Sequence, residues 1–85
     1  MTDIVVVDDH ALFRSGLIGL LSDMPNIHVV GEASNGKEGV EVVLQTKPDI
    51  VLLDVNMPVM GGVEAVRAIK AVVHTHIIML TISKS

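Results

Sequence analysis

Residues 4–9 read Ile4-Val5-Val6-Val7-Asp8-Asp9, a continuous run of aliphatic residues that ends in two acidic side chains. A run without polar alternation is typical of a strand covered on both faces in a parallel sheet. The stretch Ile50-Val51-Leu52-Leu53-Asp54 repeats this pattern with a single terminal aspartate. Two buried strands that each lead into aspartate predict an α/β protein with a parallel sheet.

Segments with apolar residues at helical spacing alternate with the predicted strands. Strands are predicted over residues 4–7, 27–32, 50–53 and 76–81. Helices are predicted over residues 10–24, between an N-cap at Asn35 and the break at Lys47-Pro48, and over 63–71. Asp9 is expected to cap the first helix and Pro25 to stop it. This βαβ alternation is expected to form one domain, since 85 residues suffice for only one core.

Composition and charge exclude several classes of protein. Hydrophobic residues make up 49% of the chain, which is too much for a disordered segment, and every apolar run is too short to span a membrane. The net charge of -4 opposes direct binding to nucleic acid. The absence of cysteine excludes thiolate chemistry. Because no basic segment precedes an apolar run near Asp3, no secretory signal is recognised and a cytoplasmic location is expected.

Polar side chains gather where the predicted strands end. Asp8, Asp9 and Asp54 fall at the carboxyl ends of parallel strands, where open α/β sheets bind their ligands. Such carboxylates repel one another unless a cation lies among them, and Mg²⁺ prefers oxygen ligands. A carboxylate beside the metal can attack a phosphoryl group, and the hydroxyl of Thr81 could then bond a phosphoryl oxygen. The alternative, that these aspartates are ordinary turn formers or N-caps, stays open at this point.

Histidine adds little to this pattern. His10 follows the acidic pair, but the first turn of a helix is an ordinary place for histidine, and a metal-ligand role is not expected for it. His74 and His76 alternate, yet two imidazoles alone make a weak transition-metal site. Both are expected to be solvent-exposed turn residues.

Three motifs resemble the receiver domain of two-component response regulators. They are Asp8-Asp9-His10, then Asp54-Val55-Asn56-Met57-Pro58-Val59-Met60-Gly61-Gly62, and finally Met79-Leu80-Thr81. They follow the family's order and spacing, and the resemblance covers the whole chain. Residues 10–17 and 29–33 are further similar to the subfamily whose receiver precedes a LuxR-type helix-turn-helix output domain.

The resemblance implies a fold and a signalling function. The fold would be a flavodoxin-like, doubly wound parallel sheet with strand order 2-1-3-4 over residues 1–85. The fourth helix, fifth strand and fifth helix of a complete receiver would be lacking. The chain would belong to a transcriptional response regulator and accept a phosphoryl group from a sensor histidine kinase. It would catalyse this transfer itself and would not otherwise be an enzyme.

The resemblance also assigns roles to individual residues. Asp54 would be the phospho-acceptor and Thr81 the switch hydroxyl. Mg²⁺ would be held by Asp9 directly, by Asp8 through water, by Asp54, and by the backbone carbonyl of Asn56.

Departures from the family pattern leave other interpretations open. The family's fifth strand ends in a lysine that pairs with the phosphoryl group, and Lys84 cannot be assumed to replace it. A phosphorylation-incompetent fragment that dimerises or binds a kinase is therefore the alternative. A shortened sheet would expose the strand over 76–81 and the inner faces of Leu52, Leu53 and Ile78, so a homodimer is expected to cover this edge.

A hydrolase of the haloacid-dehalogenase type is disfavoured. That class also uses an aspartate nucleophile after a hydrophobic strand, together with Mg²⁺. It normally carries Asp-x-Asp, whereas this chain has Asp54-Val55-Asn56.

Overall fold

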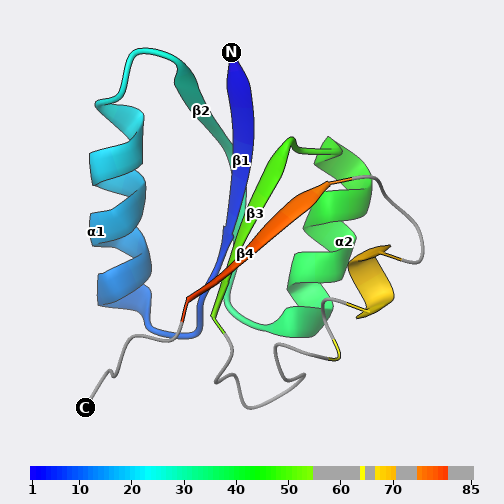
Figure 1. Ribbon diagram of the computed structural model, residues 1–85. Helices are drawn as coiled ribbons and strands as arrows, with labels where there is room; N and C mark the ends of the chain where they lie inside the picture. The colour runs from blue at the N-terminus through cyan, green and yellow to red at the C-terminus, as the bar shows by residue number, and fades with distance from the viewer. Residues whose placement is uncertain (55–63, 65–66, 71–74, 81–85) are drawn as a thin grey trace.

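The computed structural model describes residues 1–54, 64, 67–70 and 75–80. Within these residues one parallel sheet is formed, with strand order β2-β1-β3-β4 (Figure 1). Its strands are β1 (Thr2–Val7), β2 (Ile27–Ala33), β3 (Ile50–Asp54) and β4 (His76–Leu80). The predicted fold class and strand order are confirmed.

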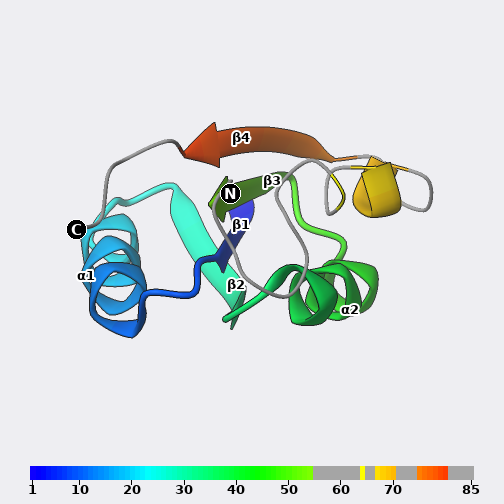
Figure 2. The ribbon, with the colours of Figure 1, turned by 90° about the horizontal axis from the view of Figure 1, so that it is seen from below.

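Helices cover both faces of the sheet. The helix α1 (Ala11–Ser22) lies on one side and α2 (Gly36–Thr46) on the other (Figures 1 and 2). Of the helix predicted over residues 63–71, residues 64 and 67–70 are described and are helical, and they lie on the side of α2. Within the described residues, neither helix combines the length and apolar character that a membrane crossing requires.

The central strands divide the core into two layers. Successive side chains of a strand point to opposite faces, so an unbroken aliphatic run fills both layers at once. The layer toward α2 consists of Val5, Val7, Ala33, Val43, Val51, Leu53 and Ile69. The layer toward α1 consists of Ile4, Val6 and Leu21, with Leu17, Ile18, Ile27, Val29, Ile50 and Leu52 packed against it.

The start of α1 differs from the prediction. His10, and not Asp9, is the N-cap residue, with extended backbone angles (φ -89°, ψ 100°) and no side-chain capping hydrogen bond. The amide of His10 instead donates to Oδ1 of Asp8 at 2.8 Å, which holds the turn in place. The helix ends at Ser22, two residues earlier than predicted, because the chain turns at Asp23 ahead of Pro25.

The start of α2 confirms the predicted cap. The side chain of Asn35 accepts a hydrogen bond from the amide of Glu38 at 2.9 Å. The Oε1 atom of Glu38 accepts from the amide and the hydroxyl of Ser34, at 3.1 and 2.5 Å. At the other end, Lys47 adopts a left-handed conformation (φ 47°) directly before Pro48, so the predicted break is also confirmed.

Two apolar surfaces remain exposed on the side of α1. Leu12 and Leu20 of α1 are 88% and 67% exposed, although both belong to the apolar pattern of that helix. Ile78 pairs with Leu52 of β3 and is 48% exposed, because β4 is the outermost strand of the described sheet. The expected exposure of Leu53 was wrong, since this side chain points toward α2 and is fully buried there.

Candidate functional site

The strand register brings two aspartates to one edge of the sheet. Val7 of β1 lies opposite Leu53 of β3, so the residues that follow them, Asp8 and Asp54, are neighbours across the two strands. The amide of Asp8 donates to the carbonyl of Ala33 at 3.0 Å, which continues the pairing of β1 with β2 by one residue. Both aspartates are buried, with exposed fractions of 0% and 1%.

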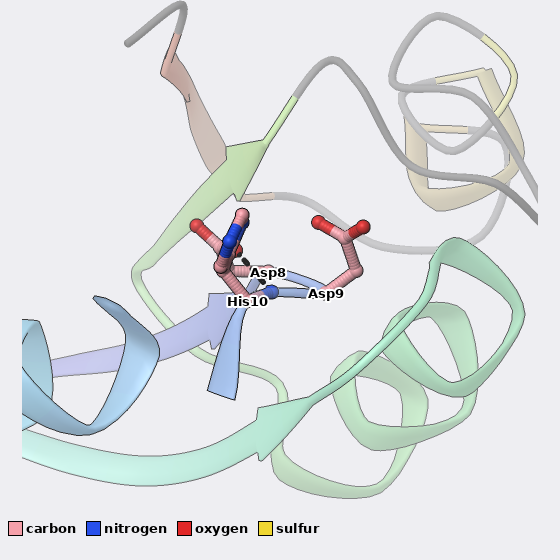
Figure 3. A group of neighbouring side chains, drawn as sticks. All are labelled: Asp8, Asp9 and His10. Atoms are coloured by element: carbon pink, nitrogen blue, oxygen red, sulfur yellow. Dashed lines mark hydrogen bonds between the residues drawn. The ribbon is translucent and has the colours of Figure 1, made fainter. Parts of the chain in front are cut away.

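Asp8, Asp9 and His10 form a compact group in the turn between β1 and α1 (Figure 3). One potential ligand atom from each residue lies within 4.8 Å of the others. Asp8 is buried, whereas Asp9 and His10 are exposed, so a buried carboxylate meets two groups that solvent can reach. The structure thus places a ligand atom of His10 near those of the acidic pair, whereas no metal-ligand role is predicted for His10 from the sequence.

Arg14 fixes this turn from α1. Its Nη1 atom donates to the backbone carbonyl of Asp8 at 2.5 Å, and its Nε atom lies 2.8 Å from Oε1 of Glu32 on β2. The backbone of α1 reinforces the arrangement, because the amide of Arg14 donates to the carbonyl of His10 at 2.8 Å. Sequence reasoning missed this role, because Arg14 contacts a backbone carbonyl six residues earlier and a side chain on another element, and no spacing in the sequence indicates either contact.

The donor set of this edge suits a hard divalent cation. Mg²⁺ in proteins binds one or two carboxylates and keeps several of its water molecules. Asp9 is exposed, so a hydrated ion can reach this residue from solvent. The structure groups Asp8, Asp9 and His10, and the strand register sets Asp54 beside Asp8. The predicted site residues Asn56 and Thr81 lie outside the described residues, as does Lys84.

The two other histidines considered from sequence are not part of this group. His76 is exposed, as expected, but it begins β4 and does not lie in a turn. It pairs with Ile50, which starts β3, at the opposite edge of the sheet from Asp54. His74 lies outside the described residues.

Comparison with known proteins gives a family match over nearly the whole chain. The family model described as the response regulator receiver domain matches residues 4–85. Among solved structures, the response regulator domain of Thermotoga maritima CheB superposes with a TM-score of 0.90 and 37% sequence identity. That match covers 93% of this chain and 59% of the other.

Curated relatives carry more than one kind of name. Protein-glutamate methylesterase/protein-glutamine glutaminase 4 of Hahella chejuensis is 46% identical over 92% of this chain, which corresponds to 20% of that protein. The nitrate/nitrite response regulator protein NarL of Escherichia coli K12 is 51% identical over 72% of this chain and 28% of NarL. The chain therefore spans less than a third of these relatives.

Proposed function

The chain belongs to the response regulator receiver domain family, and from this membership we propose that residues 1–85 act as a phospho-acceptor unit in a cytoplasmic phosphorelay. Asp54 is the proposed acceptor, and a phosphohistidine of a sensor histidine kinase is the proposed donor. The observation that carries the proposal is the placement of buried Asp54 beside Asp8 at the carboxyl edge of the sheet. Since the match concerns the receiver, similarity to the methylesterases does not extend to their catalytic part.

The proposed transfer uses the carboxylate of Asp54 as nucleophile. One carboxylate oxygen attacks phosphorus, an O–P bond forms, and the P–N bond to the donor imidazole breaks. The imidazole leaves with the electron pair of that bond. The product is an acyl phosphate on Asp54, whose oxygens the hydroxyl of Thr81 is proposed to contact.

Asp8 and Asp9 are proposed to hold Mg²⁺ together with Asp54 and the backbone carbonyl of Asn56. When bound, the metal offsets negative charge on the carboxylates and on the phosphoryl oxygens. The contribution of the protein is positional. Asp8 is anchored on both sides of its side chain, by its amide to Ala33 and by its carbonyl to Arg14, while exposed Asp9 remains accessible to a hydrated ion.

Transcriptional output of the LuxR type is the proposed readout of the phosphorylated state. Similarity to a solved two-component response regulator of the LuxR family from Aurantimonas sp. SI85-9A1, at 33% identity over 95% of this chain, supports this. Direct nucleic-acid binding is not assigned to residues 1–85 because their net charge is -4. A reporter-gene assay tests this proposal. The response of the reporter to the signal should be lost in Asp54→Asn. A signal-dependent change in methylester content, with no change in transcription, would contradict it.

Intact-protein mass spectrometry tests the proposed phosphorylation. The chain is incubated with acetyl phosphate in the presence of Mg²⁺ or EDTA, beside Asp54→Asn and the matched control Asp49→Asn. A phosphoryl adduct is expected only with Mg²⁺, in the unmodified chain and in Asp49→Asn. Absence of the adduct from a sample that circular dichroism shows to be folded would refute the phospho-acceptor function.

A second candidate function rests on the exposed apolar surfaces. We propose, as the alternative, a dimerising or kinase-binding module that accepts no phosphate, with Ile78 and its neighbours on β4 covered by a second copy. Light scattering at micromolar concentration should then give a dimer that Ile78→Lys dissociates. A monomer in the unmodified chain would refute the homodimer.

A further inference from the structure

Arg14 is attached to the turn between β1 and α1 at two points. Its backbone amide donates to the carbonyl of His10 at 2.8 Å. Its Nη1 atom donates to the carbonyl of Asp8, six residues earlier in the chain. The side chain is only 16% exposed, so the second hydrogen bond is shielded from most of the solvent. Arg14 thus ties the start of α1 back to the end of β1.

The carboxylate of Glu32 fixes the direction of the guanidinium. Glu32 lies on β2 opposite Val6 of β1, which belongs to the core layer toward α1. Its Oε1 atom lies 2.8 Å from Nε of Arg14. Because the guanidinium is planar and rigid, holding Nε also determines where Nη1 points. The position of the Asp8 carbonyl is therefore set by a contact with a neighbouring strand.

Asp9 lies between two peptide groups that are each held in place. The carbonyl of the peptide before it, from Asp8, accepts a hydrogen bond from Arg14. The amide of the peptide after it, from His10, donates to Oδ1 of Asp8 at 2.8 Å. Since peptide groups are planar, holding both groups restricts the two backbone dihedral angles of Asp9. The exposed carboxylate of Asp9, drawn in Figure 3, extends from this restricted backbone.

The turn holds two acidic side chains close together. One carboxylate oxygen of Asp8 and one of Asp9 lie within 4.8 Å of each other. When both groups are ionised, their repulsion favours a turn that opens and moves Asp9 away. The hydrogen bond from the guanidinium opposes this opening, and a charged donor makes a stronger hydrogen bond than a neutral one.

We propose that Arg14 is a positioning residue for the acceptor chemistry, because it keeps the carboxylates of Asp8 and Asp9 within reach of one hydrated ion. The inference rests on the proposed function, in which these two residues hold Mg²⁺. Arg14 itself acts through Asp9. Its charge alone has the opposite effect, since a cationic side chain near the site repels a dication. The sign of the change in Mg²⁺ affinity therefore separates positioning from charge.

Isothermal titration calorimetry with MgCl₂ measures this change. In Arg14→Ala the Mg²⁺ affinity should fall by at least about tenfold, as is typical when a partner that orients a metal ligand is removed. Arg14→Lys should also lose affinity although the charge is kept, because an ammonium group lacks the rigid fork that binds Glu32 and the Asp8 carbonyl together. Unchanged or increased affinity in folded Arg14→Ala, or full affinity in Arg14→Lys, would overturn the proposal.

Two control variants separate positioning from a general loss of stability. Val43→Ala removes methyl groups from the core layer toward α2 and should lower the thermal midpoint without changing the Mg²⁺ affinity. Arg67→Ala removes an exposed arginine from the helical residues 67–70 and should preserve both values. A loss of Mg²⁺ affinity in Val43→Ala as large as that in Arg14→Ala would show that stability alone controls binding, and the role of Arg14 would be refuted.

The kinetics of phosphorylation by acetyl phosphate provide a second readout. In Arg14→Ala the half-saturating Mg²⁺ concentration should rise by the same factor as the Mg²⁺ dissociation constant. The rate at saturating Mg²⁺ should change less, because Asp54 remains in place as the nucleophile. An unchanged half-saturating concentration with a reduced maximal rate would contradict action through Asp9.

Hydrogen exchange of the His10 amide in the metal-free chain tests the anchoring independently of Mg²⁺. Relative to the amides of β1, exchange should accelerate by at least about tenfold in Arg14→Ala, since a hydrogen bond from a charged group is lost from the turn. Arg67→Ala should leave it unchanged. If the unmodified chain binds Mg²⁺ but the acceleration is missing, the inference fails and the magnesium site stands. If the acceleration is seen but Mg²⁺ does not bind, the proposed function fails and the anchoring of the turn stands.

Discussion

Arg14 on α1 and Glu32 on β2 form an ion pair with an Nε–Oε1 distance of 2.8 Å, and the same guanidinium donates to the carbonyl of Asp8. The arginine side chain is only 16% exposed, whereas that of the glutamate is 55% exposed. Arg14 thus links a helix, a strand and the acidic turn. Solvent weakens its ion pair with exposed Glu32 more than its hydrogen bond to the part-buried carbonyl of Asp8.

Replacing Arg14 should therefore destabilise the protein more than replacing Glu32. Arg14→Ala should lower the free energy of unfolding by about 1–3 kcal/mol, because a charged donor is removed from a shielded carbonyl. Glu32→Gln should cost less than about 1 kcal/mol, as expected for an exposed ion pair. Urea titrations followed by circular dichroism measure both values. An equal or larger loss in Glu32→Gln would contradict the role assigned to the Asp8 carbonyl.

Acid should weaken the start of α2. Hydrogen bonds from the hydroxyl and the amide of Ser34 hold the pKa of Glu38 below its usual value of 4.5. A lowered folded-state pKa stabilises the protein above the unfolded value, and this contribution is lost as the pH falls through the folded value. The stability difference between the unmodified chain and Glu38→Gln should thus be constant above pH 4.5 and shrink on further acidification.

Thermal unfolding over a pH series measures this difference, with Ser34→Ala as the control. Removing the Ser34 hydroxyl should reduce the difference and move its loss closer to pH 4.5, because the main cause of the lowered pKa is gone. A difference between the unmodified chain and Glu38→Gln that persists unchanged into strong acid would contradict the assignment.

Two glycines should respond oppositely to the same substitution. A Cβ atom at Gly31 on β2 would lie 2.6 Å from Cγ1 of Val42 on α2, whereas at Gly19 of α1 it would meet nothing within 4 Å. Gly31→Ala should therefore destabilise the protein by about 1–3 kcal/mol through overpacking. Gly19→Ala should stabilise it by about 1 kcal/mol, because alanine favours a helix interior. Urea midpoints measure both changes. Destabilisation by Gly19→Ala would contradict the open space that the structure shows beside Gly19.

Magnesium should stabilise the folded chain through Asp9. When free Mg²⁺ is about ten times its dissociation constant, binding to the native state alone adds about 1.4 kcal/mol. The thermal midpoint should rise with Mg²⁺ and return to its starting value with EDTA. Asp9→Asn should abolish the rise, and Asp23→Asn, at the exposed end of α1, should preserve it. A rise that survives Asp9→Asn would place the metal elsewhere.

The sheet and the main acidic residues were predictable because their signals are local. Aliphatic runs such as Ile4 to Val7 define buried strands, and the aspartates directly after them must lie at the carboxyl edge of a parallel sheet. The cap at Asn35 was equally local, since side chain and amide lie within one helical turn.

Features that depend on distant contacts were missed or wrong. The ion pair of Arg14 with Glu32 joins residues on different elements, and no helical or strand spacing in the sequence predicts it. Leu53 was expected to be exposed, but the face on which it lies depends on the position of α2 and Ile69. The capping role of Asp9 was wrong because Asp8, one residue earlier, organises the turn through its own side chain.

The central position of β1 also has a consequence for how the molecule assembles. Its partners are β2 and β3, so β1, which is synthesised before both, acquires its second neighbour only after α1, β2 and α2 have been synthesised. Long-range parallel pairing of this kind slows folding, since a large loop must close before its contacts form. Asp8 and Asp54 become neighbours only at that late step. Affinity for the proposed metal at this edge would therefore report the pairing of β1 with β3, and a nascent chain that ends before β3 would lack Asp54 beside Asp8.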